Sequence, residues 1–420
     1  MNPKAKHLAV LALSAGVTLP FTASATNGYF LMGYGAMARG VGGAAVAFPQ
    51  DSLVAAANPA GIADLSSRFD VGMELFNPER SAWAPGLPGG KNIVKSDDHL
   101  FLLPNMGGVF QFNQKLSFGI AAVGNGGMNT RYNTNFFNLG GNEPTLGVNL
   151  AQMLITPTAA YKITPTQSVG ASLVIGIQQF RAYGLSDFNS FNFSSNPAKL
   201  SNNGNDWSYG AGIRVGWLGK FLDGRLNLGA TVASKVYMTR FRKYTGLFAE
   251  NGNFDIPANF AVGIAFKPVQ STTLALDVER ILYEGVTSIA NLGPTNLAPP
   301  PAANKLGTPG GYGFGWQDMT VYKAGIATNL NRQWTVRAGY NYGHSPIPDT
   351  QLLFNTLAPG IVERHVSVGF TYRPNPSTDI TFTAVHAFRR DQAAYDPATG
   401  NNVRISLAES SVELAYGMHF

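Results

Sequence analysis

The chain has 420 residues and no cysteine, with 30 basic against 24 acidic residues, and only 13% of its residues are charged. This near balance argues against a nucleic-acid-binding protein, which needs a concentrated basic face, and the lack of cysteine excludes a disulfide-held fold. Typical soluble domains carry about twice this share of charge, roughly 25%.

Residues 1–25 have the layout of a secretory signal peptide. Lys4 and Lys6 form a positive start, the next dozen or so residues are largely apolar, and Ala23-Ser24-Ala25 is a small-x-small cleavage site. An uncleaved membrane anchor is the less favoured alternative, because this apolar stretch is too short to span a bilayer as a helix. We expect export and cleavage after Ala25.

Residues 26–67 differ from the rest of the chain, because they are rich in alanine and glycine and lack alternating hydrophobicity. Small residues at this density favour short helices and tight turns packed against other backbone. The segment is long enough to fold inside a barrel lumen. We therefore predict a plug, called the hatch below.

Residues 68–420 show period-two alternation. In one example Trp334, Val336 and Ala338 alternate with Thr335 and Arg337. On every strand one set of alternate residues is apolar and the other is small or polar. This pattern indicates a transmembrane β-barrel with lipid outside and a wet lumen inside. Fourteen antiparallel strands are predicted to begin near Arg68, Met106, Leu116, Asn149, Ser168, Asp206, Arg225, Phe254, Thr272, Asp318, Trp334, Glu363, Thr378 and Val403.

Short turns alternate with longer polar connections along this region, as periplasmic turns and extracellular loops do in outer-membrane barrels. The longer connections are predicted near residues 84–97, 134–147, 186–206, 286–315, 348–362 and 392–402. The last strand places Met418 and Phe420 on one face and ends on the aromatic ring. This ending resembles the closing strand that the barrel-assembly machinery reads in bacterial outer-membrane proteins.

A glycine-rich lead (Gly33, Gly35, Gly40, Gly42 and Gly43) precedes Asp51 and Asn58-Pro59-Ala60-Gly61, and this pattern resembles the hatch of the FadL/TodX family. Further matching segments are Trp316-x-Asp318, Val336-Arg337-Ala338-Gly339-Tyr340-x-Tyr342 and Ser345-Pro346-Ile347-Pro348-Asp349. The family transports long-chain fatty acids and aromatic or other hydrocarbons across the outer membrane. The similarity spans nearly the whole chain after residue 25.

The resemblance implies a monomeric barrel closed by the hatch. It also implies capture of a hydrophobic ligand at extracellular loops, a pocket at the start of the hatch, and lateral exit into the membrane beside a kinked third strand. In this chain the kink would be Gly124-Asn125-Gly126-Gly127, although these glycines could simply end the strand. The turn Asn58-Pro59-Ala60 is expected near that opening.

The start of the hatch offers apolar side chains for the ligand pocket, namely Phe30, Leu31, Met32 and Tyr34, although these could equally only anchor the plug. A fatty acid would also require a buried cation for its carboxylate. Candidate partners are Arg39, Arg214, Lys323 and Arg337. Pairing of such residues with Asp277, Glu279 or Asp318 is the structural alternative.

The sequence thus predicts passive outer-membrane uptake of hydrophobic compounds, first of long-chain fatty acids, with hydrocarbons or general porin diffusion as alternatives. Outer-membrane lipid and lipopolysaccharide would surround the barrel. We expect no enzyme, cofactor, metal or nucleic-acid partner. His365-x-Ser367 has a phospholipase-like spacing, but the alternation turns both side chains toward the lumen, away from membrane lipid. The scattered histidines show no metal-ligand spacing.

Overall fold

The computed structural model describes residues 26–420 except 139, 141–142 and 191. The signal peptide expected over residues 1–25 lies outside the described residues. Among the helices of the described residues, none is long and apolar enough to cross a membrane.

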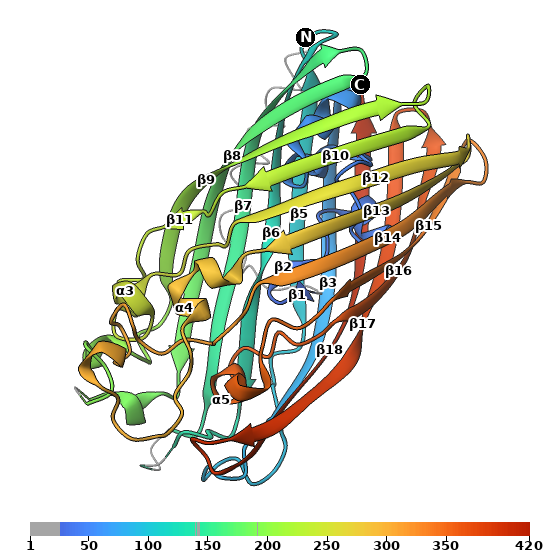
Figure 1. Ribbon diagram of the computed structural model, residues 1–420. Helices are drawn as coiled ribbons and strands as arrows, with labels where there is room; N and C mark the ends of the chain where they lie inside the picture. The colour runs from blue at the N-terminus through green and yellow to red at the C-terminus, as the bar shows by residue number, and fades with distance from the viewer. Residues whose placement is uncertain (1–25, 139, 141–142, 191) are drawn as a thin grey trace.

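Fourteen antiparallel strands form a closed barrel, as the alternation predicted (Figure 1). Closure comes from pairing of the last strand with the first, from Arg404↔Trp83 to His419↔Arg68. A closed sheet has no free edge that would leave a row of backbone N–H and C=O groups unpaired in the hydrocarbon core of the membrane. The barrel strands are β3 (Arg68–Trp83), β5 (Phe101–Gln111), β6 (Leu116–Tyr132), β7 (Leu146–Thr164), β8 (Gln167–Tyr183), β9 (Asp206–Phe221), β10 (Leu226–Ala233), β12 (Asn259–Val269), β13 (Thr272–Ile281), β14 (Met319–Asn329), β15 (Trp334–Gly343), β16 (Arg364–Asn375), β17 (Thr378–Asp396) and β18 (Asn401–His419).

The alternation corresponds to the two faces of the wall. On β13, Leu274, Leu276 and Val278 are exposed on the outside, whereas Ala275 and Asp277 between them are buried inside. A basic residue on the outer face would meet hydrocarbon at a cost of roughly 2–4 kcal/mol at the midplane, and the cost falls toward the interfaces. The polar and small residues therefore point inward.

Several strand and loop boundaries differ from expectation. The region 392–402 is not a loop, because β17 and β18 continue to the pair Asp396↔Asn401. β5 and β12 begin at Phe101 and Asn259, each five residues from the predicted starts. Residues 234–258 form a long connection that the sequence did not reveal, with the short strand β11 (Tyr237–Met238) and helix α3 (Ala249–Gly252). Alternation marks only the part of a strand that touches lipid, so strand ends above the membrane escape it.

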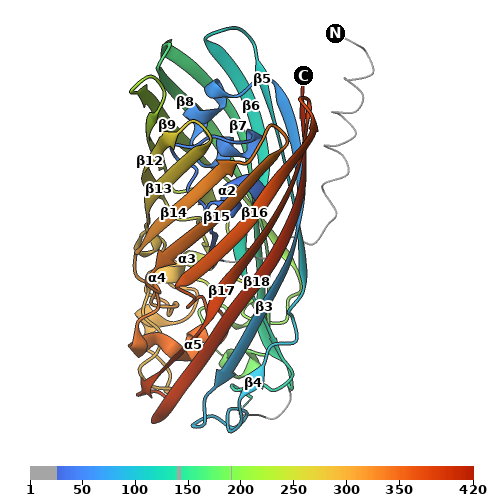
Figure 2. The same cartoon turned by 90° about the vertical axis from the view of Figure 1, so that its right-hand side faces the viewer.

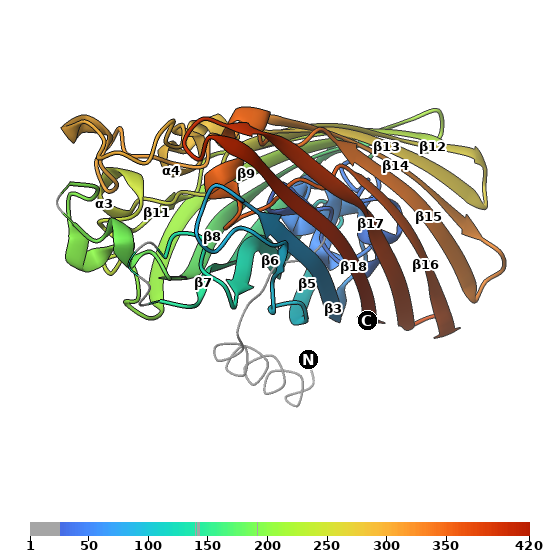
Figure 3. The same ribbon diagram turned by 90° about the horizontal axis from the view of Figure 1, so that it is seen from below.

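The hatch lies inside the barrel, as Figures 2 and 3 show for the blue segments enclosed by β13 to β18. Its elements are β1 (Thr26–Asn27), β2 (Phe30–Leu31), α2 (Ala36–Gly40) and the 3-10 helices η1 (Ser52–Ala56) and η2 (Pro59–Asp64). Asp277 on β13 accepts hydrogen bonds from the backbone of Ala45 (2.8 Å) and Val46 (2.9 Å). A Cβ at Gly339 would lie 2.0 Å from Gly42 N, so the wall is glycine where the hatch backbone touches it.

The long connections gather at the end of the barrel opposite Phe420 (Figures 1 and 2). They contain β4 (Val94–Lys95), η3 (Ser186–Phe188), η4 (Pro197–Lys199), α3, η5 (Tyr283–Gly285), α4 (Thr287–Ala290), η6 (Ala302–Asn304), η7 (Asp349–Gln351) and α5 (Leu352–Asn355). Phe420 lies at the end with the short turns. The loop end is therefore the extracellular one and the hatch lies below it.

Candidate ligand route

An apolar cavity lies among the extracellular loops. The centre of a water-sized sphere can occupy about 50 Å³ of it, within about 570 Å³ of empty space that includes open solvent. The cavity lining is aromatic and aliphatic apart from the hydroxyl groups of Ser288 and Tyr312, and no charged residue lines it among the described residues. The lining side chains include Phe137, Phe180, Phe188, Leu247, Phe248, Leu306, Tyr312, Phe314 and Phe354. The cavity can therefore hold an apolar group but offers no counter-ion.

This cavity was not predicted from the sequence, because many of its lining residues come from segments predicted to be polar loops, and others come from β8 and the 234–258 connection. Phe180 packs against Phe248 with ring centroids 4.6 Å apart and against Tyr244 at 4.8 Å. The available signal was the presence of rings such as Phe137 and Phe188 inside otherwise polar segments. A large ring in such a segment needs cover, and other loops are the nearest cover.

Below the loops, the first hatch residues enter a second aromatic cluster. The ring of Tyr29 lies 5.4 Å from that of Tyr283 and 5.9 Å from that of Trp316. The Tyr283 hydroxyl donates to Asn27 O (2.5 Å) and accepts from Tyr29 N (3.2 Å). The hatch start is thus held by a tyrosine of η5, on the extracellular connection that follows β13. Tyr283 and Trp316 were not among the predicted pocket residues.

The four predicted pocket residues have three different surroundings. Phe30 packs on Tyr29 and Tyr283. Met32 belongs to a separate buried cluster with Phe76 and Phe101. Leu31 and Tyr34 line a small hollow beside β5 and β6. They therefore do not converge on one cavity in this structure.

The third strand, β6, is irregular where the glycine-rich segment predicted a kink. Its register with β7 shifts between Gly124 and Gly126, so Asn125 is an inserted residue. Gly126 has φ +139°, a conformation that favours glycine. The Asn125 amide donates to Gln152 Oε1 (3.0 Å), and β6 continues to Tyr132. The glycines therefore bend the strand and do not end it.

The ladder between β5 and β6 is interrupted beside this bulge. Their pairing ends at Met106↔Ala122, although both strands extend further and β5 stays paired with β3 up to Phe101. Pro104, in the unpaired part of β5, has no N–H to donate. Farther out, Asp97 N donates to Arg131 O (2.7 Å) and links the wall again. The wall thus has a limited gap in its hydrogen-bond ladder.

The hatch covers this gap from inside. Phe30 of β2 pairs with Gly126, where a Cβ would lie 1.6 Å from Tyr29 O. The hollow that Leu31 and Tyr34 line is bounded on the wall side by Leu103, Pro104, Asn105, Val123 and Gly124. The hollow therefore lies between the start of the hatch and the gap in the ladder.

The turn Asn58-Pro59-Ala60, which was expected near the lateral opening at the third strand, lies against β8 and β9 instead. The Asn58 amide donates to Trp217 O on β9 (3.0 Å), and its carbonyl oxygen caps η2 by accepting from Ala60 N (3.1 Å). A Cβ at Gly170 or Gly216, on β8 and β9, would clash with this turn. The motif therefore seats the hatch on glycines of β8 and β9.

Each predicted carboxylate partner is engaged by the protein. Arg39, which is buried, pairs with Glu74 and with Glu413 (3.5 Å). Lys323 Nζ lies 2.7 Å from Glu279 Oε2. Arg337 donates to Gln50 and Thr371, and Arg214 donates to Ala57 O and Asn259. Of the acidic residues expected to pair in the lumen, Asp277 binds hatch backbone, and Asp318 lies 3.4 Å from Arg280.

Arg80 is a further buried cation, which sequence reasoning missed. It is 6% exposed and borders a small hollow with Thr26, Met128 and Glu409. Among the described residues its side chain makes one hydrogen bond, a long one of 3.4 Å to Asp98 O, and its guanidinium lies 5.9 Å from the centre of the Phe101 ring. Arg80 has no carboxylate within 4.0 Å among the described residues. It lies deep in the lumen at the start of the hatch.

A family model described as outer membrane protein transport protein (OMPP1/FadL/TodX) matches residues 21–418. The chain belongs to this family. It is an outer-membrane transporter of hydrophobic compounds, and the family is one of transporters and not of enzymes. The family and the barrel together indicate the bacterial outer membrane.

Solved structures agree on the fold. The toluene transporter TodX of Pseudomonas putida has a TM-score of 0.70 at 18% identity over 94% of this chain and 100% of that one. The Ralstonia pickettii toluene transporter TbuX gives 0.67 at 18% identity, over 93% of this chain and 99% of its own. A Pseudomonas aeruginosa FadL homologue gives 0.69 at 14% identity, over 94% and 100%. A search of curated proteins found no match.

Proposed function

We propose that this protein lets small hydrophobic molecules cross the outer membrane passively, from the loop cavity past the Tyr29 cluster to the gap between β5 and β6. The observation that carries the proposal is the interrupted ladder with the hatch start seated against it. The ligand would leave sideways into lipid once β2 moves. The general porin alternative is disfavoured, because the hatch occupies the lumen.

The physical reason for a lateral route is the hydrophobic effect. Each methylene that moves from water to an apolar site gains about 0.8 kcal/mol. A ligand that passes from the loop cavity into hydrocarbon never has to cross the aqueous periplasmic mouth. The transfer needs only a concentration gradient.

Neutral hydrocarbons are the favoured substrate class. The loop cavity is aromatic and has no charged lining residue among those described. In addition, each basic residue predicted to meet a carboxylate already has a protein partner. The solved toluene transporters share the fold, which is compatible with this assignment.

Long-chain fatty acids, the substrate that the sequence analysis favoured, are the second candidate, and Arg80 is the observation that supports them. A buried guanidinium with one long hydrogen bond can bind a carboxylate that reaches the hatch start. A fatty acid would then place its chain toward the gap and its headgroup at Arg80.

The experiment measures uptake in a strain that lacks the protein and is complemented with variants. Hydrocarbon and fatty-acid uptake are assayed separately. Leu247→Asp puts a charge into the cavity wall and should reduce uptake of the true substrate, while Leu292→Asp, at an exposed loop site, should not. Arg80→Met should reduce fatty-acid uptake alone. Unchanged uptake of every hydrophobic compound on deletion would refute the proposal.

We also propose that the barrel acts as a monomer and that its assembly uses the C-terminal strand. The sheet closes within one chain. Phe420 is exposed, and its backbone N–H donates to Ser67 O (3.1 Å). The ring is therefore free for recognition by the assembly machinery at the periplasmic end.

A further inference from the structure

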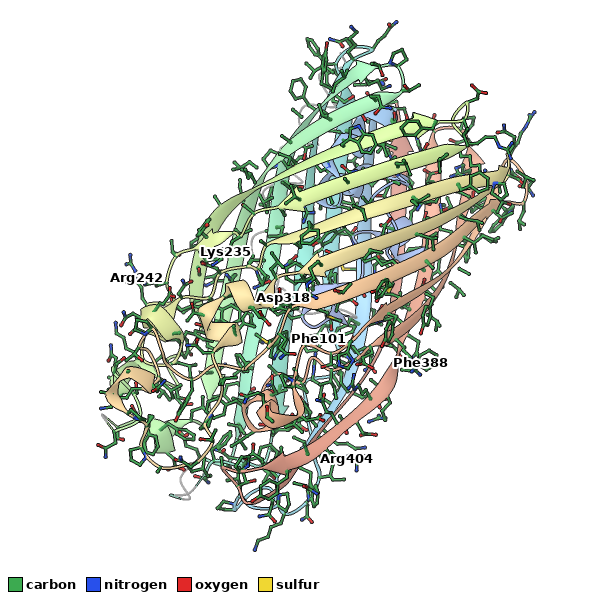
Figure 4. The ribbon with its side chains drawn as sticks, viewed as in Figure 1. Phe101, Lys235, Arg242, Asp318, Phe388 and Arg404 are labelled. Atoms are coloured by element: carbon green, nitrogen blue, oxygen red, sulfur yellow. The ribbon has the colours of Figure 1, made fainter. Side chains whose placement is uncertain are left out.

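A cluster of basic residues lies on the connection between β10 and β12 that the sequence analysis overlooked. Lys235, Arg240, Arg242 and Lys243 fall within nine residues of one another. Arg240 and Arg242 are exposed on either side of Phe241, which is fully buried. Figure 4 shows Lys235 and Arg242 along the same margin of the barrel, with Arg242 directed away from it.

This cluster lies at the level where the lipid-facing wall ends. Tyr237 is 67% exposed, and Tyr209 and Trp207 are exposed on the neighbouring β9. Thr239 joins the two segments, since its backbone donates to Tyr209 O (2.8 Å). Exposed tyrosine and tryptophan at the end of an apolar wall mark the membrane–water interface. Arg240 follows Thr239 directly, so the cations lie at headgroup height.

The two arginines are not engaged in direct polar contacts with the described residues, although the charge of Arg240 acts electrostatically on Glu250. Neither guanidinium has a hydrogen-bond or ion-pair partner among the described residues. The flanking lysines are engaged, since Lys235 Nζ lies 3.9 Å from Asp255 and 5.8 Å from the Tyr237 ring centre. Lys243 Nζ donates to Asn205 O (2.8 Å). The nearby acids are Asp206, Glu250 and Asp255, and each accepts hydrogen bonds from local groups.

Because Phe241 is buried and both of its neighbours are exposed, the guanidinium groups of Arg240 and Arg242 lie on the same outer surface. Guanidinium groups bind phosphate oxygens in a bidentate manner, and an arginine keeps its charge at any physiological pH. The outer leaflet of this membrane presents phosphorylated sugar headgroups at that height. The exposed aromatic rings could contact the acyl chains of such a lipid, and the two guanidinium groups could bind its phosphates.

We propose that Arg240 and Arg242, flanked by Lys235 and Tyr237, form a binding site for the phosphate groups of lipopolysaccharide. The site holds a lipid at the loop-bearing margin on the wall formed by β9 to β12. It is independent of the transported substrate and of the lateral gap between β5 and β6.

The test uses the full barrel, purified in nonionic detergent with EDTA so that divalent cations cannot bridge charges. Native mass spectrometry measures retention of lipid A with both phosphates, of dephosphorylated lipid A, and of inorganic phosphate. The double variant R240Q/R242Q is compared with K115Q/R332Q, which removes two exposed charges at the periplasmic turns. R240K/R242K keeps the positive charges but removes the guanidinium groups that can bind phosphate in a bidentate manner.

We expect R240Q/R242Q to lose retention of the phosphorylated lipid roughly thirtyfold, given about 1 kcal/mol for each basic residue near an anionic surface. The periplasmic control should match the wild type, R240K/R242K should fall between, and dephosphorylated lipid A should bind weakly to all. Heat-modifiable migration on gels checks that each barrel is folded. Equal retention by R240Q/R242Q, equal loss in the control, or equally strong binding of inorganic phosphate would each overturn the proposal.

Discussion

The Tyr34 hydroxyl donates a hydrogen bond of 2.9 Å to Oδ1 of Asn125, the residue inserted between Gly124 and Gly126 in β6. One bond therefore joins the hatch to the irregular strand at the gap. Burial raises the pKa of Tyr34 to about 12, so the hydroxyl remains a donor at neutral pH.

Loss of this bond should ease movement of the hatch. Tyr34→Phe removes a contribution of about 1 kcal/mol, which favours the displaced hatch by roughly fivefold. Uptake of a hydrophobic substrate should rise by up to that factor in a whole-cell assay. Tyr161→Phe, on the exposed outer face, is the control. Identical rates in the two variants would show that the bond does not restrain the hatch.

A larger side chain at Gly124 should narrow the gap. A Cβ there would lie 3.4 Å from Leu103 Cδ2, an ordinary contact, so a side chain can begin at this position beside β5, and Gly124→Leu adds bulk there. We expect uptake to fall several-fold with the barrel folded. Gly108→Leu changes an outward position on the paired part of β5, where the nearest atom is 3.6 Å away. Equal uptake by both variants would argue against exit at this place.

Gly126→Ala should displace β2 from the strand. The methyl group would lie 1.6 Å from Tyr29 O, and φ +139° disfavours alanine independently. Because the pairing with β7 continues on both sides, the barrel should still form. Hydrogen exchange at residues 29–31 should accelerate relative to Gly108→Ala. Unchanged hydrogen-exchange protection of residues 29–31 would mean that β6 shifts to make room for the methyl group while β2 stays in place.

Arg39→Met should destabilise the seat of the hatch. Arg39 is 1% exposed, and its removal leaves the buried carboxylates of Glu74 and Glu413 without that cation. Breaking such a buried cluster costs about 3–5 kcal/mol. The urea midpoint of unfolding should drop, whereas Arg332→Met at an exposed turn should leave it unchanged. A small shift in Arg39→Met would indicate that the carboxylates take up protons or water at little cost.

The bulge in β6 is a feature of the candidate site that the sequence predicted. The glycines of residues 124–127 predicted a kink because glycine tolerates backbone conformations that other residues avoid. The same reasoning could not place the turn at Asn58, because its glycine partners Gly170 and Gly216 are more than a hundred residues away. Nor could it show that Arg39 pairs with Glu74, since that contact joins two separate elements.

The alternation of Trp334, Val336 and Ala338 with Thr335 and Arg337 was sufficient to predict a closed transmembrane barrel, because a strand between lipid and lumen sorts its side chains with period two. That signal is local, and it ends where the lipid ends. The interrupted β5–β6 ladder, the loop cavity and the outward pair Arg240 and Arg242 depend on which distant segments meet. Only the tertiary structure decided these features, because the alternation of hydrophobicity along a strand does not show which distant segments that strand contacts.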